Sequence, residues 1–249
     1  MFVFTSQKRE SMFILLIQMD QFISYLTKNN ISFDQEKIQN IKMFFDLLCE
    51  WNQKINLTAI REEKDIWLKH FIDSSTIIPF IPPHTKKIID IGTGAGFPGL
   101  VIAILKPEVQ ITLVDSVGKK ITFLKTVIDQ LALKNTEVLC TRAEDLATQK
   151  KYREQFDVGV SRAVALLPTL LEYSLPFIKK QGIFIAQKQK GDEDEQSTNA
   201  LSVLGGNIQQ KIALTVEHLS PRELIIVQKT HTTPSEYPRK EGLPKRRPL

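Results

Sequence analysis

A glycine-rich turn between two hydrophobic segments is the part of this sequence best suited to binding a ligand. The segment KKIIDIGTGAGFPGL places Asp90 at the end of a hydrophobic strand and Gly92, Gly94 and Gly96 in the turn that opens the next helix. Glycines there permit positive φ angles and let a ligand lie against the main chain. The GxGxxG fingerprint of dinucleotide sites would need a glycine at Phe97. The shorter GxGxG spacing therefore favours a ligand without a pyrophosphate, whose positive amino acid end Asp90 could pair with.

Two positions downstream extend this candidate ligand site. Asp115 ends the hydrophobic segment QITLVD about 20 residues beyond the glycines, where an acid reaches the ribose hydroxyls of a bound nucleoside. Arg142, Ala143 and Glu144 begin the connection after the next strand, from which backbone amides and a side chain can contact adenine. S-adenosylmethionine has a ribose, an adenine and a positive amino acid end but no pyrophosphate. We therefore expect it as the cofactor.

The region after the fourth strand bears on the methyl acceptor. It reads FDVGVSRAVALLP, which lacks the Asn/Asp-Pro-Pro-aromatic motif common in enzymes that methylate exocyclic amino groups. No Pro-Cys nucleophile is present, and Cys49 and Cys140 are interpreted as buried packing residues. An acceptor that needs little activation fits best. Guanine N7 has a lone pair and no proton to lose, so alignment could supply most of its catalysis. Carboxylates and other acceptors stay open.

Two helices and a third helical segment are expected before the glycine turn. Apolar residues recur at three- and four-residue intervals up to residue 60, with Asp34 a plausible N-cap for the second helix. Residues 61–80 predict a third helix, with His70 and Asp73 on one face. We divide the chain into a poorly assignable N-terminus (1–20), an N-terminal helical segment (21–83), a cofactor domain (84–232) and a basic, proline-rich tail (233–249).

Strand-like and helical segments alternate from Lys86 to about Thr230. This order predicts an α/β fold with a doubly wound, mostly parallel, Rossmann-like sheet and an N-terminal helical extension. It is the architecture of class I S-adenosylmethionine-dependent methyltransferases. Near the end, IALTVEHL and RELIIVQK are strand candidates for an antiparallel edge hairpin. KGDEDEQSTNA, which is acidic and polar, is expected to be a surface loop.

Charge and composition narrow the classes of protein. The 249 residues carry a net charge of +5, and the segment from Thr233 onward supplies +3 of it. A cationic, proline-rich tail is typical of a contact to a polyanion, and equally of a solubilising disordered end. Two isolated cysteines favour a reducing cytoplasm, and four scattered histidines offer no metal ligand set. No apolar run reaches the roughly 20 residues of a membrane span, and a monomer is the default.

Several motifs together resemble the RsmG family, also called GidB: WNQKINLT, HFIDS, IDIGTGAGFPGL, LVDSVGKK with FLK, RAEDL, SRA and YPRKEGLPKRRPL. The resemblance runs from about Trp51 onward and includes motifs outside the generic cofactor core. It implies a bacterial enzyme that methylates N7 of a guanine in small-subunit (16S) ribosomal RNA. It also implies cofactor contacts at Gly92, Phe97, Ala143, Glu144 and Arg162.

The same resemblance implies which residues surround the guanine and its phosphates. Arginine and lysine can pair with phosphate or with guanine O6, and Asn and Asp can bond the base edges. The residues implied are Asn56, His70, Asp73, Lys119, Arg142, Arg162 and Lys188, with Arg239, Lys245 and Arg246 of the tail as further RNA contacts. Lys190 is an alternative to Lys188, because the sequence reads Lys188-Gln189-Lys190-Gly191.

Other interpretations of these residues stay open at this stage. His70 and Asp73 could be a hydrogen-bonded surface pair, and Asn56 could cap the turn after the second helix. An NAD-dependent oxidoreductase would use the same turn but would need the longer glycine spacing. Methyl transfer to another acceptor and a non-catalytic RNA-binding protein of the same fold are the remaining alternatives.

Overall fold

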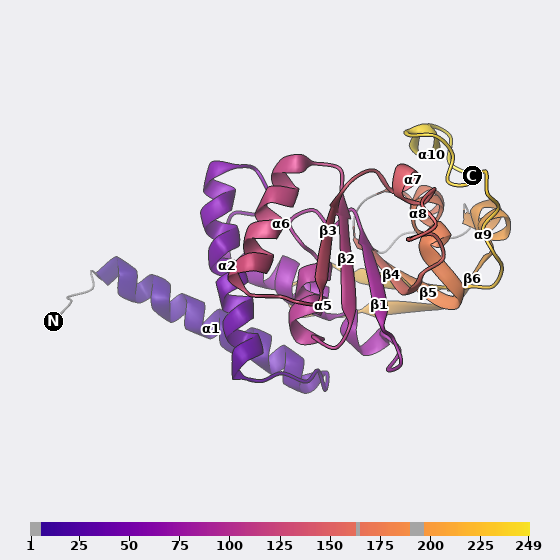
Figure 1. The fold of residues 1–249 in the computed structure, drawn as a ribbon. Helices are drawn as coiled ribbons and strands as arrows, with labels where there is room; N and C mark the ends of the chain where they lie inside the picture. The colour runs from indigo at the N-terminus through magenta and orange to yellow at the C-terminus, as the bar shows by residue number, and fades with distance from the viewer. Residues whose placement is uncertain (1–5, 163–164, 190–196) are drawn as a thin grey trace.

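A seven-stranded sheet forms the centre of the molecule in the computed structural model, which describes residues 6–162, 165–189 and 197–249 (Figure 1). The strand order is β3-β2-β1-β4-β5-β7-β6. The first five strands pair in parallel, and β7 is antiparallel to both β5 and β6. The predicted doubly wound, mostly parallel sheet is confirmed. The strands are β1 (Lys87–Ile91), β2 (Gln110–Asp115), β3 (Thr136–Cys140), β4 (Phe156–Arg162), β5 (Ile178–Gln189), β6 (Gly206–Leu214) and β7 (Arg222–Lys229).

Helices cover both faces of the sheet and create two hydrophobic cores. Alternate residues of each strand point to opposite faces, so Ile88 of β1 lies in one core and Ile89 in the other. The first core packs α5 (Gly99–Leu105) and α6 (Gly118–Gln130) against the N-terminal helices. The second contains α7 (Ala143–Leu146), α8 (Leu167–Ser174), η3 (Leu175–Phe177) and α9 (Thr198–Leu204).

The N-terminal helices α1 (Ser6–Lys28) and α2 (Gln35–Lys54) lie against the first core (Figure 1). Asp34 caps α2 as expected, because its side chain accepts a hydrogen bond from the Lys37 amide at 2.8 Å. Helix α1 begins well before residue 20, where the sequence suggested no clear element. Its buried Phe22 stands 5.7 Å from the ring of Trp67, which ties the extension to the segment that follows α2.

The third helical segment differs from a single helix over 61–80. It consists of α3 (Glu63–Ile66), a π-helical turn η1 (Trp67–Ile72), α4 (Asp73–Ser75) and a 3-10 turn η2 (Ile78–Phe80). The α-helical periodicity did not indicate the wider turn, since a π-turn adds one residue without changing the apolar composition. This turn positions His70 and Asp73.

Two sequence interpretations need correction. The first strand of the edge hairpin was expected at residues 212–219, whereas β6 covers residues 206–214 and places the polar GNIQQK in the edge strand. One face of an antiparallel edge strand meets solvent, so a polar composition does not exclude it. The expected burial of the cysteines is also wrong for Cys140, which is exposed, while Cys49 is half-buried.

The tail is ordered and returns to the body of the protein. It runs across the second core, forms the short helix α10 (Leu243–Arg246) and buries Pro244 (Figure 1, yellow). Across the described residues, no helix is long and apolar enough to cross a membrane. The same ranges contain no group of three or more His, Cys, Asp or Glu arranged to hold a metal ion.

Candidate functional site

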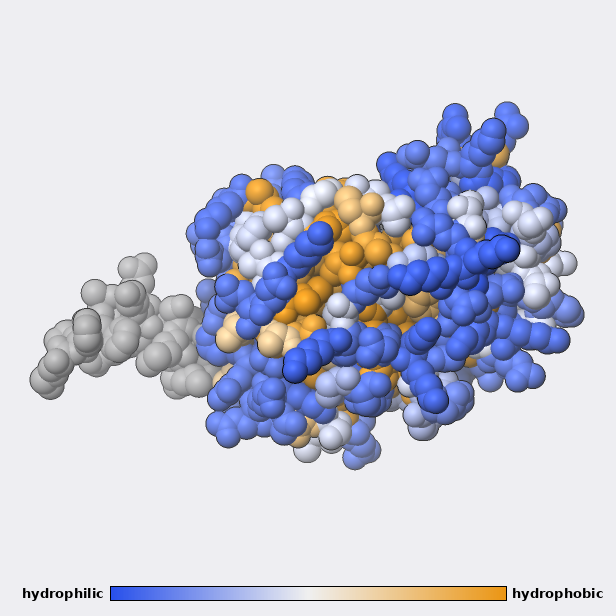
Figure 2. Space-filling model, viewed as in Figure 1, coloured by the Kyte–Doolittle hydropathy of each residue, from blue (hydrophilic) through white to orange (hydrophobic). Residues whose placement is uncertain are grey.

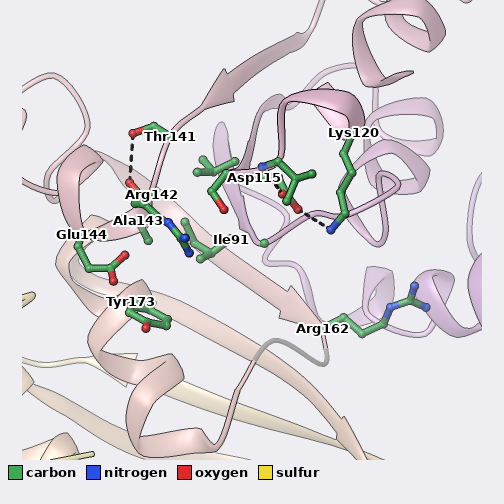
Figure 3. A pocket seen from close by; sticks show the side chains of 13 residues that line it. Ile91, Asp115, Lys120, Thr141, Arg142, Ala143, Glu144, Arg162 and Tyr173 are labelled. Carbon is green, nitrogen blue, oxygen red and sulfur yellow. Dashed lines mark hydrogen bonds and ion pairs between the residues drawn. The ribbon is translucent and has the colours of Figure 1, made fainter. Parts of the chain in front are cut away.

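Two cavities open at the carboxyl ends of the parallel strands, where open α/β sheets bind ligands. The first, of about 320 Å³, is lined by residues that follow β1, β2, β3 and β4 and by Tyr173 of α8 (Figure 3). The second, of about 500 Å³, lies between η1 and the ends of β4, β5 and β7. Arg162, the last residue of β4, lines both.

The glycine turn wraps from β1 toward α5 and borders the first cavity at Gly92. All three glycines have positive φ, +73° at Gly92, +62° at Gly94 and +98° at Gly96. At Gly96 an added Cβ would lie 2.5 Å from a methyl carbon of Leu100, so the turn has neither the angles nor the space for a side chain there. The predicted turn is therefore a tight backbone connection beside the cavity.

Asp115 lines the first cavity and is hydrogen-bonded to the glycine turn. Its carboxylate accepts hydrogen bonds from the amides of Gly94 at 3.0 Å and Val117 at 2.9 Å. Lys120 approaches the same carboxylate at 3.3 Å. A carboxylate offers about four acceptor positions, so these three donors leave room for a ligand hydroxyl. The ribose contact expected from the sequence stays a prediction.

The opposite wall comes from the connection after β3. Figure 3 shows Arg142, Ala143 and Glu144 on one side of the cavity, with the Glu144 side chain near the ring of Tyr173. The Glu144 carboxylate is largely buried and accepts a hydrogen bond from the Gly242 amide at 3.2 Å. The Arg142 side chain is about half exposed and pairs with Glu241 at 3.0 Å. Both contacts reach this wall from the tail.

Two residues predicted to contact the cofactor lie behind the cavity rather than in its lining. Asp90 is fully buried and accepts a hydrogen bond from the Gly99 amide at 2.8 Å, which fixes the start of α5. Burial raises the pKa of Asp90 to about 6. Phe97 is packed under the ring of His70, with centroids 4.7 Å apart, and under the Arg162 guanidinium. The structure gives both residues a supporting position.

Arg162 is the central residue of the second cavity. Its Nη1 donates to the Lys69 carbonyl at 2.8 Å and to the Asp73 carboxylate at 3.0 Å, and its Nη2 lies 3.0 Å from His70 Nδ1. The π-turn explains the first contact. The Asp73 amide donates to the carbonyls of Leu68 and His70 instead of the Lys69 carbonyl, which it would meet in a regular α-helix. The Lys69 carbonyl instead accepts from Arg162.

His70 is held as a neutral ring. Burial, which is the larger cause, and the neighbouring Arg162 guanidinium together lower its pKa to about 3. An arginine can only donate, so His70 Nδ1 must accept from Arg162, and the proton must reside on Nε2. Nε2 then donates to the Thr58 hydroxyl, 2.8 Å away. This chain from Thr58 through His70 fixes one edge of the Arg162 guanidinium.

Asp73 is a buried hub and not a surface partner of His70. Its carboxylate accepts from Arg162, from Gln187 Nε2 at 3.0 Å and from Arg222 Nε at 3.3 Å, and its side chain is 1% exposed. Gln187 also donates to the Thr76 hydroxyl at 3.1 Å. These donors surround the carboxylate. The main effect of Asp73 is therefore to fix the positions of Arg162 and Arg222, and not to contact a ligand.

The remaining predicted residues differ in whether they line a cavity. Lys188 lines the second cavity and donates to the Ala165 carbonyl at 2.7 Å, whereas Lys190 lies outside the described residues. Asn56 is exposed, outside both linings, and accepts from Arg61. The turn after α2 is instead capped by Asn52, which accepts from the amides of Leu57 and Thr58. Lys119 is exposed beside Lys120, and it is Lys120 that lines the first cavity.

Tail residues predicted to contact RNA fall into two groups. Arg239 forms an ion pair within the protein. Its Nη2 lies 2.6 Å from the buried carboxylate of Glu172, and its Nε donates to both carboxylate oxygens. Lys245 and Arg246 are exposed in α10. Figure 2 shows hydrophilic side chains projecting from this part of the surface. Lys245 and Arg246 are therefore accessible, whereas Arg239 is only partly exposed and is bonded to Glu172.

Sequence reasoning missed several residues of the second cavity. Gln187 lies near the end of β5, and Arg222 is the first residue of β7. In the antiparallel register of these strands, Arg222 is opposite Gln189, and both Gln187 and Arg222 line the cavity. The antiparallel hairpin was predicted in part, but its register was not, and the register alone brings Arg222 to Asp73. Thr58 is the last residue of the WNQKINLT motif, and nothing in its spacing indicated a contact with His70.

Comparison with known proteins gives this geometry a context. A family model described as rRNA small subunit methyltransferase G, GidB, matches residues 37–225. A ribosomal RNA small subunit methyltransferase G from Acetivibrio thermocellus is 45% identical over 88% of this chain and 91% of the relative. One of the same description from Desulfitobacterium hafniense is 44% identical over 94% of this chain and the full length of the relative.

Solved structures share the fold at low sequence identity. A ribosomal protein L11 methylase from Lactobacillus delbrueckii subsp. bulgaricus has a TM-score of 0.51 at 16% identity and covers 66% of this chain and 79% of its own. TYW2 of M. jannaschii, solved in complex with AdoMet, has a TM-score of 0.51 at 12% identity and covers 64% of this chain and 81% of its own. These likenesses show the methyltransferase fold.

Proposed function

This chain belongs to the family of rRNA small subunit methyltransferase G, and on that premise we propose that it methylates N7 of a guanine in small-subunit ribosomal RNA. The protein is an S-adenosylmethionine-dependent methyltransferase. The observation that carries the assignment of the two cavities is the position of Arg162, which lines both of them. A donor cavity and an acceptor cavity must meet where the methyl group passes, and Arg162 marks that junction.

The first cavity fits S-adenosylmethionine by the chemistry of its walls. Asp115 retains acceptor capacity for the ribose, and Gly92 lets the ligand approach the backbone. Ala143 and Glu144 form the wall proposed for the adenine, and Gly94 and Gly96 shape the turn. When bound, the cofactor supplies a methyl group on a positively charged sulfur. The protein's part is to hold it and to exclude alternative acceptors.

The second cavity supports a mechanism of positioning without proton transfer. Guanine N7 has no proton to remove. His70 is neutral and hydrogen-bonded at both ring nitrogens, so it is not placed to remove a proton. Arg162 and Lys188 line the cavity as cations for guanine O6 or a phosphate. Arg162 has five N–H groups, and it donates three hydrogen bonds to described residues. The remaining N–H groups can bind an anionic group.

Asp73 acts in this proposal through the arginines. A bare carboxylate near a methylated, cationic guanine would stabilise developing positive charge. Here the carboxylate is enclosed by Arg162, Arg222 and Gln187, so its main effect is to fix Arg162 at the junction. Asn56 lies outside the cavity, and a role for it at the substrate rests on family resemblance.

We further propose that RNA follows the basic rim. Arg142 and Lys119 are exposed near the first cavity, and Lys245 and Arg246 are exposed on α10. Such cations bind phosphates without regard to base identity and set orientation. We propose that the protein acts as a monomer in the cytoplasm, with residues 21–83 and 84–232 as the helical and cofactor parts and 233–249 as the tail.

The function is tested by incubating the purified protein with methyl-labelled S-adenosylmethionine and either unmodified small-subunit RNA or assembled subunits. Nucleoside analysis is expected to show labelled 7-methylguanosine at one site. Label in another nucleoside would replace the proposed acceptor atom. Cofactor binding with no label in either RNA or subunits would favour a different acceptor or a non-catalytic RNA-binding role.

A further inference from the structure

The tail is fastened to the protein by a series of polar contacts that its composition did not predict. We call residues 233–249 the C-terminal strap. At its start, Arg153 donates to the backbone carbonyls of Thr233, Pro234 and Tyr237 at 2.8 to 3.0 Å. The Thr233 amide donates to the Glu154 carboxylate at 2.9 Å. A guanidinium that binds three backbone carbonyls within five residues fixes the path of that segment.

The middle of the strap is anchored at a buried carboxylate. Glu172 of α8 is 0% exposed, and both of its oxygens accept from the Arg239 side chain, while Oε1 also accepts from the Arg239 amide at 2.7 Å. A buried carboxylate without such partners would be strongly unfavourable, so the contact holds the strap at this point. The next residue along α8 is Tyr173, which lines the first cavity.

Just beyond this anchor the strap reaches the wall of the first cavity. The Gly242 amide donates to Glu144 Oε1, and Glu241 pairs with Arg142. Glu144 and Arg142 both line the cavity. Gly242 has φ of +75°, a conformation that glycine adopts without strain, which turns the chain so that its amide meets Glu144. The strap thus supports the wall that we assign to the adenine.

We propose that the C-terminal strap is a positioning element of the cofactor cavity, acting through Glu144 and Arg142. The inference rests on the proposed function of the first cavity. It goes beyond the family assignment, because the matching family model ends at residue 225, before the strap begins. The strap does not touch the reacting atoms. It fixes the wall before the cofactor binds, so binding need not order that wall.

The strap also links the binding of RNA to the binding of the cofactor. The exposed Lys245 and Arg246 belong to the same strap as Gly242, within one turn of it. RNA that stabilises the observed path of the strap therefore also stabilises the cavity wall. By linkage, the cofactor then strengthens RNA binding by the same factor by which RNA strengthens cofactor binding.

The direct test measures S-adenosylmethionine affinity by titration calorimetry without RNA. A protein lacking residues 239–249 is compared with the full chain. We expect the dissociation constant to rise about tenfold, the scale of a lost hydrogen bond to a charged group. At saturating cofactor, kcat of RNA methylation on a fixed RNA is expected to fall much less than kcat/KM for the cofactor. Unchanged cofactor affinity in a folded truncated protein would overturn the proposal.

A second set of variants tests the path through Glu144 in the full-length chain, in case the truncated protein unfolds. Glu144→Ala removes the acceptor and is expected to weaken cofactor binding about as much as truncation, whereas Glu144→Gln keeps an acceptor oxygen and is expected to restore most of the affinity. Lys240→Gln, an exposed strap residue, is the matched control and should leave the dissociation constant unchanged.

Combining the changes separates positioning from direct contact. In the truncated protein, Glu144→Ala is expected to cause little further loss of affinity, because its strap partner is already gone. An equal loss in both backgrounds would mean that Glu144 acts independently of the strap. If the full chain itself does not bind S-adenosylmethionine, the assignment of the cavity fails, an outcome distinct from equal binding by the full and truncated chains.

Discussion

At the scale of single residues, one arginine connects the two cavities, and its neighbours determine where its guanidinium lies. Lys69, His70 and Asp73 each accept from Arg162 within 3.0 Å. None of these three contacts is a ligand contact. The chemistry of the site therefore depends on a layer of residues behind the cavity surface, and substitutions in that layer should change catalysis.

Thr58 offers a test of this layer. Thr58→Val removes the hydroxyl that accepts from His70 Nε2 while preserving shape, so we expect kcat/KM for RNA methylation to fall about tenfold. Thr58→Ser retains the hydroxyl and should retain most of the activity. Nitrogen-15 spectra of the wild-type imidazole should show a protonated Nε2 and an unprotonated Nδ1. A protonated Nδ1, or equal losses in both variants, would contradict the assigned chain.

The buried His70 also predicts a pH dependence of stability. Its folded pKa of about 3 lies below the unfolded value of 6.5, so its neutral form stabilises the fold above pH 6.5 and that contribution is lost as pH falls toward 3. Asp90 acts in the opposite direction. Its folded pKa is raised to about 6, so its stabilising contribution is present below pH 3.8 and is lost as pH rises through 6.

Denaturant unfolding of the wild type and of His70→Gln at several pH values isolates the histidine. The free energy of unfolding of the wild type should decrease more steeply from pH 6.5 toward 4 than that of His70→Gln, by a few kcal/mol in total. His84→Gln, at an exposed histidine, should keep the wild-type slope. Parallel curves for the wild type and His70→Gln would show that His70 does not titrate as described.

At the scale of elements, the glycine turn and the alternation of strands and helices could be predicted from the sequence because their signals are local. Positive φ at Gly92 and alternating strands and helices have compositional signatures. The register of β7 against β5, which brings Arg222 to Asp73, has none, because it depends on pairing between distant segments. The π-turn was missed for a different reason, since one extra residue leaves the apolar composition of the segment unchanged.

A pair of glycines tests the turn. Gly96→Ala is expected to lower the free energy of unfolding by about 1 to 3 kcal/mol, because φ is +98° and the new Cβ would press on Leu100. Gly118→Ala at the start of α6 meets nothing within 4 Å and should change stability by no more than about 0.5 kcal/mol. Thermal or denaturant unfolding of both variants decides, and similar losses would count against the turn as the cause.

At the scale of the whole molecule, the sequence locates the excess positive charge in the tail, but its composition did not predict that the tail folds against the protein. A proline-rich basic tail reads as disordered because composition does not reveal partners elsewhere in the fold. Here Arg153 and Glu172, both distant in sequence, supply those partners. Among the tail's cations, Arg239 stabilises the fold, whereas Lys245 and Arg246 are exposed to solvent.

This division predicts how salt affects RNA binding. Each exposed cation that contacts a phosphate contributes to the slope of log affinity against log salt, so Lys245→Gln and Arg246→Gln should each reduce its magnitude by about 1. Arg239→Gln should instead lower the melting temperature, because it leaves the buried Glu172 without its partner. Filter binding at several salt concentrations and thermal unfolding distinguish the two groups, and an unchanged slope in the first two would place the RNA elsewhere.

The π-turn also has a genetic consequence. A turn with one residue more than an α-helix can lose one residue and become regular while its flanks stay in place. An in-frame loss of the Leu68 codon should therefore yield a protein that folds and accumulates normally, yet returns the Lys69 carbonyl to the helix and removes one of the three acceptors of Arg162. Most single-codon deletions inside helices damage folding first. In this helix, such a deletion is expected to lower activity with little effect on folding.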